Sequence, residues 1–122
     1  MKVLIIDDDE ALRTMYLERM KAEGFEVEIA PNGEKGLARV TDFKPDVIML
    51  DVMMPKINGF AVLDILKTTP EYKNIPVIIL SALIQPENKE RAIKSGAADY
   101  LVKSEALPAQ VVAKIKEAVG KN

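Results

Sequence analysis

Short apolar runs alternate with longer amphipathic segments along the whole chain. The short runs are bounded by polar or turn-forming residues, which is typical of strands buried on both faces of a parallel sheet. Residues 25–29 differ because apolar and acidic residues alternate there, so we expect this strand to be buried on one face and to lie at a sheet edge. The predicted strands are 2–6, 25–29, 46–50, 77–80 and 99–102, and the predicted helices are 10–23, 34–43, 58–67, 87–95 and 108–119.

Strands that alternate with helices in this way predict a doubly wound α/β domain. Right-handed crossovers would place the strands parallel, with helices on both faces of the sheet. A chain of 122 residues is the length of one domain with a sizeable core. No stretch approaches the roughly 20 apolar residues of a membrane helix, and the first apolar run is too short for a signal peptide. We therefore expect a cytoplasmic domain that does not bind a membrane.

The composition removes several kinds of chemistry. The chain has no cysteine and no histidine, which excludes disulfides and thiolate sites and removes the commonest general base and transition-metal ligand. Any metal ion would have to be held by oxygen atoms, which favours a hard cation. The net charge is -2, so no overall basic field would attract nucleic acid, and we expect no direct nucleic-acid binding.

Polar side chains follow four of the predicted strands at the point where each strand ends. Asp7 and Asp8 follow the first strand, Asp51 follows the third, Ser81 follows the fourth and Lys103 follows the fifth. Ligands of open parallel sheets bind at the carboxyl ends of the strands. The sequence therefore predicts a site with three carboxylates, a hydroxyl and an ammonium group.

The charges of these residues predict the chemistry of the site. Three neighbouring carboxylates repel one another and stay ionised together only if a cation joins them. Asp7, Asp8 and Asp51 carry -3 and Lys103 carries +1, which leaves -2, the charge that one Mg²⁺ would neutralise. Asp51 stands alone at its strand end and is the natural nucleophile toward phosphorus, whereas Asp7 and Asp8 form the natural metal clamp.

Each residue also has a plainer interpretation. An aspartate pair after a strand is often a turn or a helix cap, and we expect Asp9 to cap the first helix. A lone serine after a strand is usually a cap, and a lone lysine is usually solvated. Met53 and Met54 are expected to pack rather than to bind a ligand. The shared position of the polar residues at the strand ends favours the functional interpretation.

Four motifs, in order, extend this interpretation over the whole chain. They are residues 5–9 (IIDDD), 50–55 (LDVMMP) with Asn58-Gly59, 80–82 (LSA), and 96–103 (GAADYLVK). With these motifs the chain resembles the receiver domain of a two-component response regulator. The resemblance implies a flavodoxin-like (βα)5 fold with strand order 2-1-3-4-5, one receiver domain over residues 1–122, and no output domain on this chain.

The resemblance also implies a metal site. Asp51 would be the phosphoacceptor in a reaction that depends on Mg²⁺. Asp8 and Asp51 would bind the ion directly, together with the backbone carbonyl of Met53. Asp7 would act largely through a water molecule.

A switch is implied as well. Lys103 would pair with Asp51 and then with the phosphoryl group. Ser81 would swing to hydrogen-bond the phosphoryl group, and Tyr100 would follow by turning inward. The plainer interpretation of Tyr100 is an aromatic side chain packed on the sheet.

By this resemblance the chain is a signalling domain that catalyses only its own phosphorylation and dephosphorylation. It would receive a phosphoryl group from a histidine of a sensor kinase or a histidine phosphotransfer protein and act on a downstream protein target. One alternative is a pseudo-receiver that only binds a partner. Another is a Mg²⁺-dependent aspartyl phosphatase, which usually has a second aspartate where Met53 stands. A flavin protein of this fold would need a phosphate-cradling loop where residues 7–9 lie.

The chain departs from the usual receiver pattern in three ways. Ser104 replaces the proline that usually follows the lysine, so we expect a trans peptide. Met53 and Leu83 stand at the positions that often tune phosphoryl lifetime, and neither side chain can orient an attacking water, so we expect slow loss of the phosphoryl group. Ala98 replaces an acidic residue of the usual dimer contact, and the last helix has lysine but no arginine, so we expect a monomer or a weak dimer.

Overall fold

The computed structural model describes residues 1–120. Its strands are β1 (Lys2–Ile6), β2 (Glu26–Ala30), β3 (Val47–Leu50), β4 (Val77–Ser81) and β5 (Asp99–Val102). Its helices are α1 (Glu10–Ala22), α2 (Gly33–Phe43), α3 (Gly59–Thr68), α4 (Pro86–Lys94) and α5 (Pro108–Gly120). All ten predicted elements are confirmed, with bounds shifted by one residue or not at all.

The strands form one parallel sheet in the order β2-β1-β3-β4-β5. The predicted fold and strand order are therefore confirmed, with β2 at an edge. The chain passes from β1 to β2 on one side and then returns to place β3 on the other side of β1, where Ile6 pairs with Leu50. The carboxyl ends of β1 and β3 are neighbours at this reversal, which is where open α/β sheets bind their ligands.

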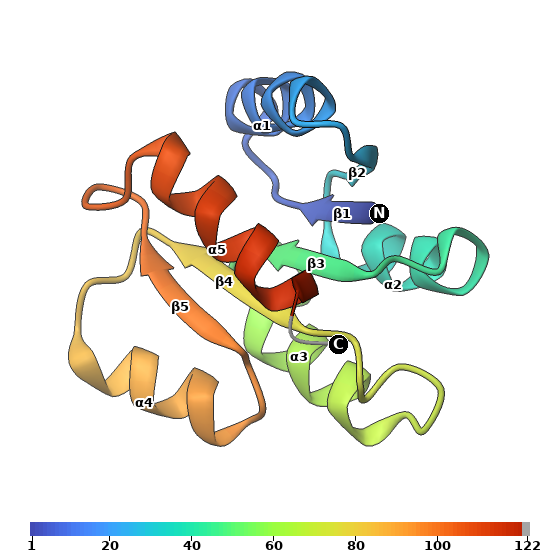
Figure 1. Ribbon diagram of the computed structural model, residues 1–122. Coiled ribbons are helices and arrows are strands. Elements are labelled where there is room, and N and C mark those ends of the chain that lie inside the picture. Colours follow the sequence, from blue (N-terminus) through green and yellow to red (C-terminus); the bar gives the residue numbers. More distant parts are fainter. Residues whose placement is uncertain (121–122) are drawn as a thin grey trace.

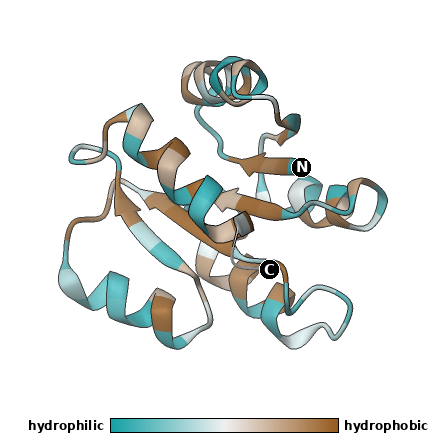
Figure 2. Ribbon diagram, viewed as in Figure 1, coloured by the Kyte–Doolittle hydropathy of each residue, from teal (hydrophilic) through white to brown (hydrophobic). Residues whose placement is uncertain are grey.

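Helices cover both faces of the sheet (Figure 1). Helices α1 and α5 pack on one face, and their buried side chains share a hydrophobic cluster with Val3 and Ile5 of β1. Helices α2, α3 and α4 cover the other face, in a second cluster with Leu4 and Ile6. Successive side chains of a strand point to opposite faces. The central strands β3 and β4 lie between two helical layers and are therefore apolar at nearly every position, as their brown colour shows (Figure 2).

The edge strand β2 shows one departure from expectation. Phe25 and Val27 pack against the cluster beneath α1, as the alternating pattern predicts. Ile29, the next apolar residue of that pattern, is 37% exposed. The predicted apolar face is therefore partly buried at Phe25 and Val27 and open to solvent at Ile29.

Side-chain caps begin the helices that follow the first three strands. Asp9, Asn32 and Asn58 accept hydrogen bonds from the backbone N–H groups of Leu12, Lys35 and Ala61 at 3.1, 2.9 and 3.0 Å. These caps satisfy N–H groups that a helix leaves unpaired at its start. The prediction that Asp9 is a cap is confirmed.

Helix α4 is anchored less firmly than the other helices. It begins at Pro86 without a side-chain cap, and Ala92 is its one buried residue. A helix with few buried side chains gains little stability from tertiary packing. No helix within residues 1–120 combines the length and the apolar character needed to cross a bilayer.

Helix α3 offers a matched test of the core. Leu63 is fully buried and Ile65, two residues further along, is 41% exposed. We expect Leu63→Ala to lower the free energy of unfolding by about 2–5 kcal/mol, because it removes buried methyl groups and leaves a cavity. Ile65→Ala should cost less than about 1 kcal/mol. Urea unfolding measures both values, and equal losses would contradict the packing described here.

Candidate functional site

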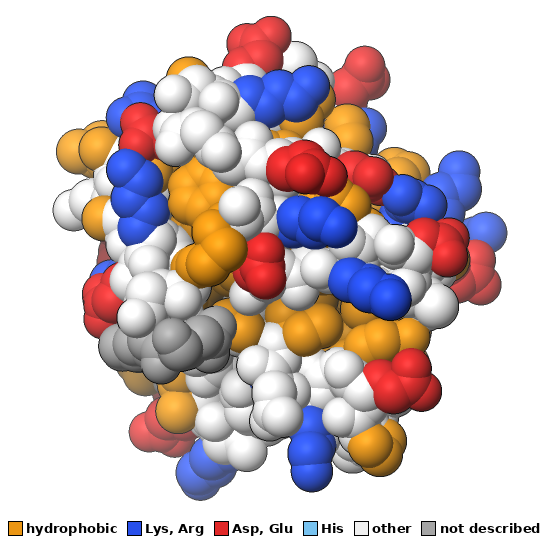
Figure 3. Space-filling view, turned by 45° about the vertical axis from the view of Figure 1, so that its right-hand side comes forward, with side chains coloured by type: hydrophobic (Ala, Val, Ile, Leu, Met, Phe, Trp, Pro, Cys, Tyr) orange, Lys and Arg blue, Asp and Glu red, His pale blue; other side chains and the backbone are white. Residues whose placement is uncertain are grey.

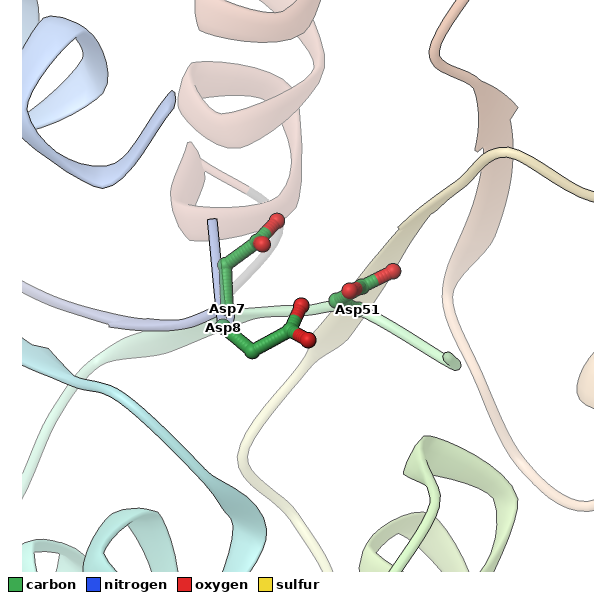
Figure 4. Close-up of side chains that lie close together, drawn as sticks. All are labelled: Asp7, Asp8 and Asp51. Carbon is green, nitrogen blue, oxygen red and sulfur yellow. The ribbon is translucent and has the colours of Figure 1, made fainter. Parts of the chain in front are cut away.

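Three carboxylates lie together at the end of β1 and β3. Backbone hydrogen bonds continue past the ends of these strands. The N–H of Asp7 donates to the carbonyl of Ala30 at 3.1 Å, and the N–H of Asp51 donates to the carbonyl of Ile6 at 2.9 Å. Carboxylate oxygens of Asp7, Asp8 and Asp51 lie within 4.8 Å of one another, and Figure 4 shows the three side chains gathered at this edge. The predicted acidic cluster therefore forms.

The turn after β1 is fixed by a chain of hydrogen bonds. Asp7 Oδ1 accepts from the N–H of Asp9 at 2.9 Å, and Asp9 in turn caps α1. The Arg13 side chain of α1 reaches back, and its Nη1 donates to the backbone carbonyl of Asp7 at 2.8 Å. Asp7 thus belongs to the turn and to the acidic cluster at once, so the two interpretations of this residue do not exclude each other.

Gly59 allows the start of α3 to approach Asp51 closely. A Cβ atom on Gly59 would lie 2.1 Å from the carbonyl oxygen of Asp51 and 2.7 Å from the Cα of Val52. The N–H of Gly59 also donates to the carbonyl of Val52 at 2.8 Å. Any larger residue would push the loop away from β3, so the Asn58-Gly59 pair both caps the helix and positions the segment after Asp51.

Lys103 bridges two members of the acidic cluster. Its Nζ lies 3.1 Å from Asp7 Oδ2 and 3.4 Å from Asp51 Oδ1. Its backbone N–H donates to the carbonyl of Ser81 at 2.7 Å, which fixes the start of the loop. Residues 1–120 contain no cis peptide bond, so the Lys103–Ser104 bond is trans as expected. The ammonium group reaches the cluster without a following proline.

Burial makes the electrostatics of Asp51 unusual. The residue is 3% exposed, and burial followed by the charge of Asp7 raises its pKa from 3.8 to about 7, although Lys103 acts in the opposite direction. Burial alone would lower the pKa of Lys103, but the carboxylates of Asp51 and Asp7 outweigh it and raise that pKa. The cluster thus keeps a proton at a pH where an isolated aspartate has lost it, and a bound cation would replace that proton.

Ser81 and Tyr100 meet at the same residue of the loop after β4. The Ser81 hydroxyl is buried and accepts from the N–H of Leu83 at 3.1 Å. Tyr100 is also buried, and its hydroxyl donates to the carbonyl of Leu83 at 2.8 Å. Tyr100 thus already lies inward in this structure, and its expected inward turn on phosphorylation stays a prediction. Leu83 joins the two predicted switch residues through its backbone, which the sequence could not indicate.

The two methionines after Asp51 behave differently. Met54 is buried in the core cluster, which confirms its predicted packing role. The same expectation was wrong for Met53, which is 56% exposed. Met53 lines an open hollow of about 510 Å³ with Leu83 and Arg91, among other residues. The Arg91 guanidinium lies 4.1 Å from the centre of the Phe60 ring and links α4 to α3, a contact that sequence reasoning missed.

Comparison with known proteins agrees with this geometry. Residues 3–116 match the family described as the response regulator receiver domain. The chain belongs to this receiver family. A gliding motility regulatory protein of Myxococcus xanthus is 44% identical to the receiver over 105 residues, which are 86% of this chain and 14% of that protein. The receiver thus corresponds to a small part of that longer relative.

Solved structures share the fold over nearly the whole receiver. The receiver domain of the Francisella response regulator 1452 matches with a TM-score of 0.92 and 33% identity, over 98% of this chain and 97% of that one. A chain of the CheX–CheY–BeF3–Mg²⁺ complex from Borrelia burgdorferi matches with a TM-score of 0.87 and 27% identity, over 95% of this chain and 87% of that one.

The raised pKa of Asp51 predicts how stability depends on pH. Folded protein holds this proton more tightly than unfolded protein, so the wild type loses stability as the pH rises from about 4 to about 7. In the Asp51→Asn variant the side chain is neutral at every pH, so this loss of folding stability does not occur. In metal-free buffer we expect the variant to be more stable by at least about 1.4 kcal/mol above pH 7, the equivalent of one pKa unit, and by much less near pH 4. Urea unfolding at both pH values checks this, and equal differences would contradict it.

Proposed function

We propose that the receiver acts in the cytoplasm as a phosphorylation-controlled switch, which accepts a phosphoryl group from a histidine of a partner onto Asp51. The observation that carries this proposal is the buried Asp51 carboxylate, with Lys103 at 3.4 Å and two further carboxylates beside it. Asp51 is the central member of this set because it alone ends the middle strand, β3. The donor would be a sensor histidine kinase or a histidine phosphotransfer protein.

The donor set fits Mg²⁺. The three clustered groups are carboxylates, and hard cations prefer oxygen ligands. Asp8, Asp51 and the backbone carbonyl of Met53 would hold the ion, with Asp7 acting through water. One chain of the Borrelia complex is similar to this chain, and that complex contains Mg²⁺ and BeF3. This supports the same ion here. When bound, Mg²⁺ would neutralise the acidic cluster and the charge on phosphoryl oxygens.

Asp51 and Lys103 would have different roles in the transfer of the phosphoryl group. A carboxylate oxygen of Asp51 would form a bond to phosphorus while the bond between phosphorus and the histidine nitrogen breaks. The phosphohistidine ring carries a proton on its other nitrogen, so the histidine leaves as the neutral imidazole. Lys103, already 3.4 Å from Asp51, would stabilise negative charge on the transferred group. Burial of Asp51 excludes bulk water from the reacting atoms, which strengthens these interactions.

Leu83 gives the switch a mechanical connection. If the Ser81 hydroxyl turns to the phosphoryl group, its hydrogen bond with the N–H of Leu83 is lost. The carbonyl of Leu83 holds the Tyr100 hydroxyl, so a change at Ser81 reaches Tyr100 through one residue. The loop leads directly into α4, the least anchored helix. A local charge change would in this way alter a surface.

The surface next to this loop is suited to a downstream protein. A groove of about 540 Å³ runs between α4, β5 and α5, with Tyr100 and Val102 among its lining residues. The side chains of Lys114 and Lys116 on α5 pair within the chain, with Asp99 and Glu23, which supports a monomer or a weak dimer. Acidic and basic side chains are interspersed over one face of the molecule (Figure 3), which suits protein contact better than nucleic acid.

Two alternatives make different predictions. An aspartyl phosphatase would need an acid near Asp51, but Met53 stands two residues along with an exposed apolar side chain. A pseudo-receiver would bind partners without phosphorylation, and the complete site argues against that. Phosphorylation of Asp51 therefore remains the function that the geometry supports best.

One experiment separates these functions. We expect acetyl phosphate to give a single acyl phosphate per molecule, only with Mg²⁺, and not with Asp51→Asn. Intact-mass spectrometry detects the adduct. Asp64→Asn, which changes an exposed aspartate of α3, is the control and should leave the adduct unchanged. Continuous release of phosphate would favour the phosphatase, and no adduct would favour the pseudo-receiver.

The residues near Asp51 also predict a slow decay of the acyl phosphate. Neither Met53 nor Leu83 can hold an attacking water by a side-chain hydrogen bond. We expect Met53→Asn and Leu83→Glu to shorten the phosphoryl lifetime several-fold, by about 1 kcal/mol in the barrier. The time course of adduct loss measures this. Ile65→Asn, at an exposed apolar position on α3, should have no effect, and unchanged lifetimes in the first two variants would refute the prediction.

A further inference from the structure

Arg13 is a cation beside the acidic cluster to which the family motifs assign no role. Its Nη1 donates to the backbone carbonyl of Asp7 at 2.8 Å. Its Nε is buried and has no hydrogen-bond partner within residues 1–120. Within the same residues Arg13 joins none of the ion pairs, which involve Arg39, Lys103, Lys114 and Lys116.

One part of the Arg13 side chain is placed at a cost to the stability of the fold. A buried guanidinium nitrogen without a partner costs free energy. The single hydrogen bond of this side chain goes to the residue where β1 ends and the acidic turn begins. An arginine that is costly in itself and directed at a site is more readily explained by a role in that site.

The hydrogen bond completes a small closed network. Asp7 Oδ1 accepts from the N–H of Asp9, Asp9 Oδ1 accepts from the N–H of Leu12, and Arg13 returns from the next position of α1 to the carbonyl of Asp7. Arg13 therefore holds the peptide between Asp7 and Asp8 at its carbonyl, and the Asp7 side chain holds the next peptide, between Asp8 and Asp9, at its N–H. The direction of that peptide decides where the Asp8 side chain points.

We propose that Arg13 is a positioning residue of the acidic site, which fixes the peptide between Asp7 and Asp8 and so directs the Asp8 carboxylate toward Asp51. The proposal rests on the Mg²⁺ site proposed above. Residues behind the ligands of a metal commonly orient them in this way, and their loss costs affinity for the metal. Arg13 would do so through the backbone and not through a ligand side chain.

The charge of Arg13 makes the proposal testable by the sign of an effect. A positive charge near the site repels Mg²⁺, so its removal alone would tighten binding. Loss of the hydrogen bond to Asp7 would loosen the turn and weaken binding. A purely electrostatic role and a positioning role therefore predict opposite changes when the guanidinium is removed.

The test compares variants of the full chain in Mg²⁺ titrations followed by amide NMR. We expect Arg13→Met to weaken Mg²⁺ binding about tenfold although it removes a repelling charge. Arg13→Lys keeps the charge but lacks the planar fork of donors, and should lose a smaller part of the affinity. Arg19→Met, the matched control, removes an exposed charge about 9 Å further along α1 and should not weaken binding.

A second readout needs no metal. In buffer with a chelator, the amide proton of Asp9 should exchange with solvent at least several-fold faster in Arg13→Met than in wild type, whereas amides of the central strand β3 should change only as much as global stability does. If wild-type protein failed to bind Mg²⁺, the proposed function would fail, and the exchange of Asp9 would still report on Arg13.

An unchanged or tighter affinity for Mg²⁺ in Arg13→Met would overturn the inference. If the free energy of unfolding fell at the same time, Arg13 would be a structural residue only. If Arg13→Met does not fold, Arg13→Lys carries the test alone, and wild-type affinity together with wild-type exchange at Asp9 would then refute the proposal.

Discussion

Mutual repulsion of three carboxylates at one edge of the sheet is the constraint on which the rest of the site depends. Asp7 and Asp51 are almost fully buried, and burial together with the charge of Asp7 raises the pKa of Asp51 to about 7. Such a cluster is unfavourable unless positive charge is brought to it. Lys103 supplies one ammonium group, and the remaining negative charge makes the site receptive to a divalent cation.

The surrounding structure holds this unfavourable cluster together by backbone contacts. The register of β1 with β3 sets the two acidic segments side by side. Gly59 lets α3 begin directly against Asp51, and the cap at Asp9 ends the turn on the other side. The backbone segments that carry Asp7 and Asp51 cannot move apart without disrupting a strand or a helix start. The stability of a well-packed core thus maintains a local arrangement that would not form by itself.

The features that could be predicted from the sequence are those that depend on the local pattern of apolar residues and on the direction of the strands. Apolar runs identify buried strands, and all parallel strands end at the same edge, so Asp51, Ser81 and Lys103 could be grouped before any coordinates were known. Contacts across elements were missed. The bond from Arg13 to the Asp7 carbonyl and the link from Tyr100 to Leu83 depend on side-chain reach and on loop direction. An apolar loop residue also carries no periodic signal, which is why the exposure of Met53 was not foreseen.

The weak anchoring of α4 has a consequence for the energy of signalling. A helix that contributes only Ala92 to the core clusters can be displaced while the other members stay packed. Its rearrangement therefore requires a small free energy and leaves the stability of the rest of the domain largely intact. A ligand or a covalent group shifts a population only by its differential interaction with the two states. Where the gap between those states is small, a change of one hydrogen bond in the loop before α4 is enough to alter which surface a partner meets.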